Sequence, residues 1–316
     1  MLNFVVALRH LFHEKNIITS IASLFVATFV AFAQAGEPFP EINVPAIYSD
    51  QASYVAYYIA HYWDRYDFAA YDKKYSEDTT GQAFANFAYL LQVQSGIGVA
   101  TPEAQAAVKA MLTRATVSED AYWHFLDLCE HYFYEPNSPM RNDEFFIPAI
   151  NHALSSKSPI DETSKSRYRT LKKTVERNRP TTIATDFTYT TQSGAQGRMH
   201  QIKSDILLLY FYNPGCSDCR RVKDMLVASE AVDALHKAGR LKVLAVYPDE
   251  DLTEWKKYLH ENPKWWVSSY DKGAVVTERN LYDLKAIPTL YLLDSDKRVV
   301  LKDPTPENLL SLLEML

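Results

Sequence analysis

The sequence predicts an α/β domain in the C-terminal half of the chain, preceded by an all-helical domain. Three observations support this division of the 316 residues. Helical patterns with capping residues fill the first half, with no strand pattern between them. Strand and helix patterns alternate in the second half, which is typical of parallel strands flanked by helices. A C-x-x-C motif, Cys216 to Cys219, lies between a buried strand and a helix of that half.

The first residues have the features of a secretory signal peptide. Basic side chains precede an uncharged run from Asn16 to Ala35, which ends in Ala-Gln-Ala. Small residues in this A-x-A pattern suit a signal peptidase, so we assign residues 1–35 to a cleaved signal. The alternative is an uncleaved membrane anchor, because Ile17 to Ala33 approaches the length of a spanning helix.

Residues 36–180 form the predicted helical domain. Thr101-Pro102-Glu103 supplies a capping hydroxyl, a proline at the first helical position and an acid in the first turn. Asp50 and Ser118 can cap helices in the same way. The apolar periodicity predicts helices at about 50–66, 82–94, 101–114, 118–134, 144–154 and 161–179.

The helical domain is rich in tyrosine, with twelve of the 21 tyrosines between Tyr48 and Tyr134. These rings could form a binding surface or pack the helices together. The spacing of four residues between Tyr54, Tyr58 and Tyr62 favours packing.

Three further side chains of this domain could carry chemistry. His124, Asp127 and His131 share one helix face and could bind a metal, but seven residues between two histidines is a long reach for one ion. Cys129 falls on the apolar face, which predicts a buried and inert thiol. The alternative for Cys129 is an intermolecular disulfide.

Residues 181–316 contain the motif on which the predicted function depends. Ile206 to Tyr212 suits a buried strand, and Asn213-Pro214-Gly215 ends it. Cys216 then lies at the start of a helix, where unpaired N–H groups and the helix dipole favour a thiolate. Cys216 is therefore the expected nucleophile, and Cys219, one turn later, the resolving thiol. A structural zinc site would need four ligands, and the chain has one other cysteine, Cys129.

The remaining patterns of this half alternate between strands and helices. They indicate parallel strands with an antiparallel hairpin at one edge. Strands are expected at about 186–191, 197–202, 206–212, 241–247, 265–269, 288–293 and 298–301, and helices at about 216–228, 251–259, 275–284 and 305–316.

A second motif supports the interpretation of the first. Ala286-Ile287-Pro288-Thr289 precedes an apolar strand, and Pro288 resembles the cis-proline that faces the C-x-x-C motif of thioredoxins. With both motifs in order, the region resembles a thioredoxin-fold domain, similar to the thioredoxin-like reductases of the bacterial envelope. The helical region, with its segment Glu135 to Pro148, resembles a module of unassigned function found with such proteins in Gram-negative bacteria.

The resemblance implies a protein dithiol-disulfide oxidoreductase of the cell envelope, and the expected signal peptide places it in the periplasm. Its partners would be proteins bearing disulfides or thiols and an envelope electron donor, with contact to the membrane only if the signal stays uncleaved. It implies no cofactor besides a redox-active Cys216–Cys219 disulfide. Pro288 would be cis and lie against that pair, and the backbone of Ile287 would hold an extended substrate.

A different class of function stays open beside this one. The net charge of −6 argues against nucleic acid as a partner. The large helical domain, however, is more than a small redox protein needs. The alternative is therefore a binding or scaffold protein whose helical domain recruits a partner.

The group that moves the proton of Cys219 is not identified by the resemblance. Thioredoxins carry a buried carboxylate at the position of Tyr210, and envelope reductases often carry a glutamate at the position of Val222. Asp218 and Asp224 are the candidates for proton transfer, with Tyr210 as a third. Asp218 could instead simply complement the helix N-terminus. The negative charge of Asp218 disfavours a thiolate at Cys216, whereas strongly oxidising cysteine pairs have a very stable thiolate. Asp218 therefore favours a reductase or isomerase.

Overall fold

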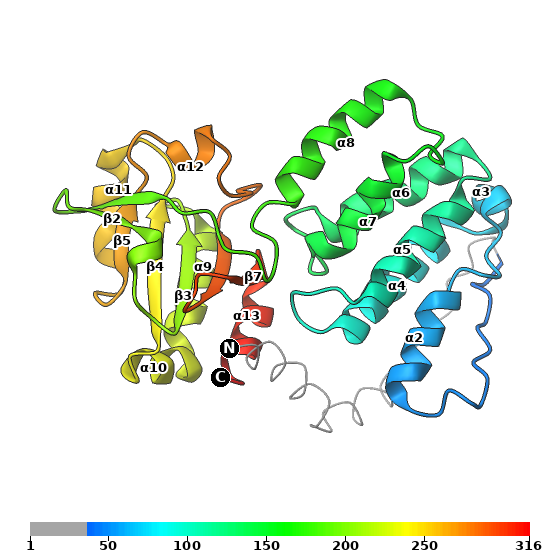
Figure 1. The fold of residues 1–316 in the computed structure, drawn as a ribbon, viewed down its shortest axis with the longest axis horizontal. Coiled ribbons are helices and arrows are strands. Elements are labelled where there is room, and N and C mark those ends of the chain that lie inside the picture. Colours follow the sequence, from blue (N-terminus) through cyan, green and yellow to red (C-terminus); the bar gives the residue numbers. More distant parts are fainter. Residues whose placement is uncertain (1–36) are drawn as a thin grey trace.

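The computed structural model describes residues 37–316, so the signal peptide expected at residues 1–35 lies outside the described residues. The described chain forms a helical domain and an α/β domain, which lie side by side (Figure 1). The predicted fold classes are both confirmed. Among residues 37–316, no helix is long and apolar enough to cross a membrane.

The helices of the first domain begin where capping side chains stand. Asp50, Thr101, Ser118 and Asp161 each accept a backbone N–H from the first turn of the following helix. Ser76 does the same, and the second long helix therefore starts five residues earlier than expected. The elements are α2 (Gln51–His61), η2 (Phe68–Ala70), α3 (Tyr71–Lys74), α4 (Glu77–Ser95), α5 (Pro102–Ala115), α6 (Glu119–Phe133), α7 (Asp143–Ala153) and α8 (Glu162–Val175).

Aromatic rings form much of the core of the helical domain. Trp63 is buried and meets Phe125 edge-on, with ring centroids 5.1 Å apart. The Tyr62 hydroxyl donates to the Ala83 carbonyl at 3.0 Å, so this buried tyrosine satisfies its polar atom within the core. Tyr62 packs in the core, as the spacing of Tyr54, Tyr58 and Tyr62 predicted, whereas Tyr54 is 45% exposed. Cys129 is fully buried in the same core, and burial raises its pKa well above the ordinary value, which makes it an inert thiol.

The α/β domain contains one mixed sheet with helices on its faces. Its elements are β1 (Thr188–Thr191), β2 (Gln196–Arg198), η3 (Met199–Gln201), β3 (Ile206–Phe211), α9 (Ser217–Ala228), α10 (Glu230–Lys237), β4 (Leu241–Tyr247), α11 (Leu252–Tyr258), η4 (Leu259–Glu261), β5 (Val267–Tyr270), α12 (Val275–Glu278), β6 (Thr289–Asp294), β7 (Val299–Lys302) and α13 (Pro306–Leu313).

The sheet has the order β2-β1-β5-β4-β3-β6-β7. The central strands β3, β4 and β5 are parallel, whereas β6 and β7 at one edge and β1 and β2 at the other are antiparallel. β6 and β7 form the antiparallel hairpin expected at one edge, and β1 and β2, near the strands expected at 186–191 and 197–202, form a second hairpin at the other edge. Alternate residues of β3 face the two hydrophobic cores on opposite sides of the sheet. Tyr210 packs in the core that contains α9 and α13. Phe211 packs in the core that contains α12 and the segment before β1, with Ala184 and Phe187.

Two helical expectations for this domain were wrong. The helix expected to reach residue 284 ends at Glu278, because Asn280 adopts a left-handed conformation (φ 49°) and the following residues make tertiary contacts. Leu281 accepts a hydrogen bond from Asn178, and Tyr282 packs in the core. The helix α10 was not expected, although Ser229 caps it.

Buried charges join the two domains. We call the six side chains that carry them the interface cluster: Arg141 and Asp143 from the helical domain, and Asp283, Lys285, Lys302 and Asp303 from the α/β domain. Lys302 Nζ also donates to the carbonyls of Val175 and Arg177, at the end of α8 and just after it, which joins the side chain of this β7 residue to the C-terminal end of the helix. Figure 1 shows α8 and β7 on the facing sides of the two domains. The cluster contains three acids and three bases, so its charges balance. This matters because a buried charge without a partner is costly.

We expect Asp303 to make stability depend on pH. Burial raises its pKa to about 6, although Arg141 and Lys285 act in the opposite direction. Between pH 4 and 6 the folded state then binds more protons than the unfolded state, so the free energy of unfolding falls as pH rises. In Asp303→Asn the side chain at this position does not titrate, so this decline in the free energy of unfolding with pH should be absent. Urea denaturation should show the variant gaining about 1–3 kcal/mol relative to the unsubstituted protein from pH 4 to 7; parallel curves would contradict the assignment.

Candidate active site at the Cys216–Cys219 pair

Cys216 caps the helix that it precedes. The turn at Gly215 has a φ of 74°, which favours glycine, and it brings the chain from β3 into α9. Cys216 is the N-cap residue, and its Sγ accepts the backbone N–H of Cys219 at 3.2 Å. The side chain is partly exposed. A sulfur in this position is open to a substrate and lies at the positive end of a helix, which suits a nucleophile.

Cys219 occupies the opposite environment. Only 3% of the residue is exposed, and it packs in the core between α9 and the sheet. Burial raises the pKa of its thiol, as does the neighbouring Cys216, while the backbone N–H of Asn213 acts in the opposite direction. This environment therefore favours the protonated form of Cys219. Both cysteines are thiols in this structure.

The loop before β6 lies against Cys216. The Ile287–Pro288 peptide bond is cis, as predicted. The Cys216 thiol is 3.8 Å from the carbonyl oxygen of Ile287, so this backbone borders Cys216. Ile287 and Cys216 also pack against the same core. The structure thus brings together Cys216, Cys219 and the loop with Ile287 and Pro288, which are about 70 residues apart in sequence.

The two candidate acids lie on the outer face of α9. Asp218 is exposed, and its carboxylate is 3.4 Å from Arg221. Asp224 is also exposed, six residues further along the helix. Tyr210 is buried, and its hydroxyl donates to the Cys219 carbonyl at 2.6 Å, while burial raises its pKa. That arrangement makes Tyr210 a hydrogen-bond donor that holds the first turn of α9.

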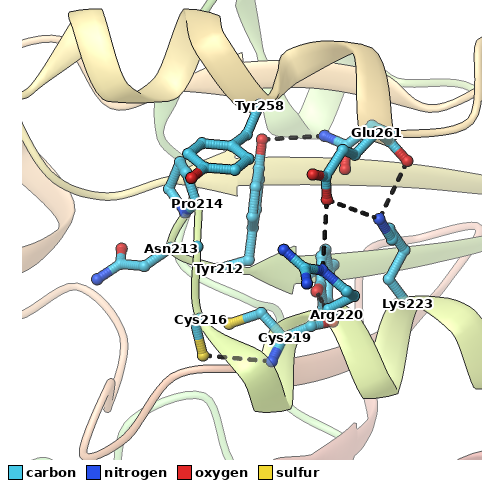
Figure 2. A pocket seen from close by; sticks show the side chains of 12 residues that line it. Tyr212, Asn213, Pro214, Cys216, Cys219, Arg220, Lys223, Tyr258 and Glu261 are labelled. Atoms are coloured by element: carbon cyan, nitrogen blue, oxygen red, sulfur yellow. Dashed lines mark hydrogen bonds and ion pairs between the residues drawn. The ribbon is translucent and has the colours of Figure 1, made fainter.

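A small cavity beside Cys219 contains an acid that the sequence did not indicate. Its volume is about 20 Å³, room for about one water molecule. Cys219, Lys223 and Glu261 are among its lining residues. Figure 2 shows Glu261, from η4, facing Lys223 and Arg220 across this cavity, with the Lys223 ammonium 3.3 Å from its carboxylate. Glu261 follows Cys219 by 42 residues in a short helical turn, and no sequence pattern links the two.

Two of the candidate metal ligands of the helical domain, His124 and His131, take part in ring packing and hydrogen bonding. His124 stacks on Tyr71, with ring centroids 5.0 Å apart, and burial lowers its pKa. His131 pairs with Glu135 at 2.7 Å. In the described residues, no group of three or more histidines, cysteines or acids is arranged to hold a metal ion.

Comparison with known proteins agrees with this architecture. Residues 13–178 match a family model described as a domain of unknown function (DUF5106), and residues 204–299 match one described as thioredoxin-like. The crystal structure of a thioredoxin-like protein from Bacteroides caccae is 36% identical and covers 88% of this chain and 99% of its own, with a TM-score of 0.81.

Shorter structures match less than half of the chain. The C-terminal domain of an uncharacterized protein from Bacteroides fragilis is 46% identical, covers 43% of this chain and 98% of its own, and has a TM-score of 0.43. The thioredoxin domain of a thiol-disulfide oxidoreductase from Bacteroides vulgatus is 22% identical, covers 43% of this chain and 96% of its own, and has a TM-score of 0.39. No curated protein matches the chain.

The fold and the family matches define a thioredoxin-like protein with an added helical domain. The chain belongs to the DUF5106 family, and its C-terminal domain is thioredoxin-like. The resemblance inferred from the two sequence motifs is therefore confirmed.

Proposed function

We propose that this protein is a dithiol-disulfide oxidoreductase of the cell envelope, which reduces or reshuffles disulfides of other proteins. The proposal rests on the difference in exposure between the two cysteines. Cys216 is partly exposed at a helix N-terminus, and Cys219 is buried one turn behind it with its N–H 3.2 Å from the Cys216 sulfur. Disulfide exchange needs this asymmetry, because one thiol must meet substrates and the other must react only with the first.

The reaction would proceed in two exchange steps. The Cys216 thiolate attacks one sulfur of a substrate disulfide, and the other substrate sulfur leaves and takes a proton. The Cys219 thiol then loses its proton, and its sulfur attacks Cys216 and releases the second substrate thiol. Two electrons pass to the substrate, and the protein ends with a Cys216–Cys219 disulfide. An envelope electron donor returns it to the dithiol state.

The proposed location and direction come from the sequence. The apolar segment and its Ala-Gln-Ala end support export to the periplasm. The acid Asp218, in the first turn of α9, supports a reductase or isomerase because it works against a strongly oxidising couple. The backbone of Ile287, beside Cys216, is suited to pair with an extended substrate segment.

Trapping the mixed disulfide tests the proposal in cells. Cys219→Ala removes the resolving thiol, so covalent complexes with substrate proteins should accumulate and disappear on treatment with a reductant. The double variant Cys216→Ser/Cys219→Ala is the matched control and should trap none. Non-reducing electrophoresis followed by mass spectrometry identifies the partners.

The same experiment separates exchange chemistry from a scaffold role. If Cys219→Ala traps no more protein than the double variant, the proposed function fails. Non-covalent recovery of one partner through the helical domain, equal in both variants, would favour the scaffold alternative. Covalent partners that depend on Cys216 would exclude a purely structural thioredoxin-like domain.

A further inference from the structure

The loop that borders Cys216 is also held by the helical domain. Residues 281–288 lead into β6, and the carbonyl of Ile287 lies 3.8 Å from the Cys216 sulfur. Two residues earlier, Lys285 turns into the interface cluster, where 9% of its side chain is exposed. One short loop therefore contacts the nucleophile at one end and the other domain a few residues away.

The shortest contact of the Lys285 ammonium is to a side chain of the helical domain, while Asp283 and Asp303 of its own domain lie further away, at 3.7 and 4.0 Å. Lys285 Nζ donates to Asp143 Oδ1 at 2.9 Å and lies 4.0 Å from the ring centroid of Tyr134. Burial disfavours the charged lysine, but Asp143, Asp303 and Asp283 raise its pKa above the ordinary value. The ammonium is therefore charged and buried, and leaving its partner would be costly.

The start of the same loop is tied to the segment between the domains. Asn178 donates from Nδ2 to the Leu281 carbonyl at 2.8 Å, and its Oδ1 accepts the N–H of Thr185 at 2.8 Å. The Tyr282 hydroxyl donates to the Thr185 carbonyl at 2.6 Å. The path of the loop toward Cys216 is thus set at Leu281 by the linker and at Lys285 by the helical domain.

We propose that Asp143 of the helical domain is a positioning residue for disulfide exchange. It holds Lys285 and thereby fixes the backbone of Ile287 where an incoming substrate segment must pair. The inference rests on the proposed function and gives the helical domain a part in it: this domain sets how well the site binds a protein disulfide. A site whose supporting contacts are loosened by a fraction of an ångström binds and orients its substrate less well.

The chain offers a matched pair of variants to test this role. Lys285 and Lys302 bind the two oxygens of the same carboxylate, Asp143, at 2.9 and 2.7 Å. Both side chains are buried, and replacing either with methionine keeps the apolar length and leaves the cluster with the same excess of one negative charge. Only Lys285 lies on the loop that reaches Ile287, whereas Lys302 lies on β7.

The proposal predicts different kinetics for the two variants. With insulin as a protein disulfide, Lys285→Met should raise KM about tenfold. With cystamine, a small disulfide that cannot pair along the loop, the same variant should react at the unsubstituted rate. Lys302→Met should leave both reactions unchanged, although it weakens the docking of the domains. Insulin and cystamine reduction are measured with the full chain and a dithiol donor.

Hydrogen exchange of residues 281–288 gives a readout that needs no turnover. Exchange should be faster in Lys285→Met than in Lys302→Met. Equal effects of the two substitutions on the insulin KM and on exchange would overturn the proposal, because they would indicate domain docking alone. If the unsubstituted protein reduces neither disulfide, the proposed function fails. Hydrogen exchange then still decides whether Lys285 positions the loop.

Discussion

Cys216→Ser is expected to abolish disulfide exchange. Serine keeps the N-cap position and can still accept the Cys219 N–H, so the helix should form. A hydroxyl is not ionised near neutral pH, however, and cannot form a mixed disulfide. Insulin reduction by the variant should fall to the rate of the dithiol donor alone. A time course of insulin precipitation, run with and without the protein, measures this.

Cys129→Ala is the control for this substitution. Cys129 is fully buried in the helical domain and lies in a core separate from those of the α/β domain. Its removal should leave the rate of insulin reduction unchanged, since a buried thiol cannot meet a disulfide in solution. Turnover that survives Cys216→Ser would contradict the assignment of the nucleophile, and loss of turnover in Cys129→Ala would show that a thiol of the helical domain takes part.

The parts of this fold that the sequence predicted are those with local signals. A capping side chain contacts an N–H two or three residues away, so Asp50, Thr101 and Ser118 marked the starts of their helices. The break at Asn213-Pro214-Gly215 placed Cys216 at a helix start for the same reason. Buried strands such as β3 and β4 were found because continuous apolar runs are themselves the signal.

The parts that could not be predicted depend on residues far apart in the chain. Lys285 looked like one more residue after a helix, and its partner Asp143 is 142 positions away. The helix expected to reach residue 284 ended early because Asn178 and the interface cluster hold the following residues. Glu261 entered the cavity beside Cys219 only because η4 folds over α9. None of these pairings leaves a periodic or spaced pattern in the sequence.

Asp143→Ala is expected to destabilise the protein more than a substitution of a neighbouring acid. Its carboxylate is buried between Lys285 and Lys302, and although burial raises its pKa, the two lysines outweigh this and lower the pKa to about 2. Removing it would leave two ammonium groups in the interface without their main partner. Breaking a buried ion pair from one side typically costs about 3–5 kcal/mol. Urea denaturation at pH 7 should show a loss of this size in the free energy of unfolding.

Two further variants show whether unpaired buried charge causes the loss of stability in Asp143→Ala. One is Glu144→Ala, and the other replaces the charged groups around Asp143 together. Glu144 lies next in α7 and binds the more exposed Arg179 at 2.7 Å, so its loss should cost about 1–2 kcal/mol. In the quadruple variant Asp143→Leu/Asp283→Asn/Lys285→Met/Lys302→Met neither an unpaired lysine nor the carboxylate of Asp283, the acid that pairs with Lys285, remains in the interface, and much of the lost stability should return. If Asp143→Ala costs no more than Glu144→Ala, or if the quadruple variant is less stable than Asp143→Ala, then unpaired buried charge does not explain the loss. In that case packing, and not the ion pairs of Asp143, would hold the helical domain against β7 and the loop before β6.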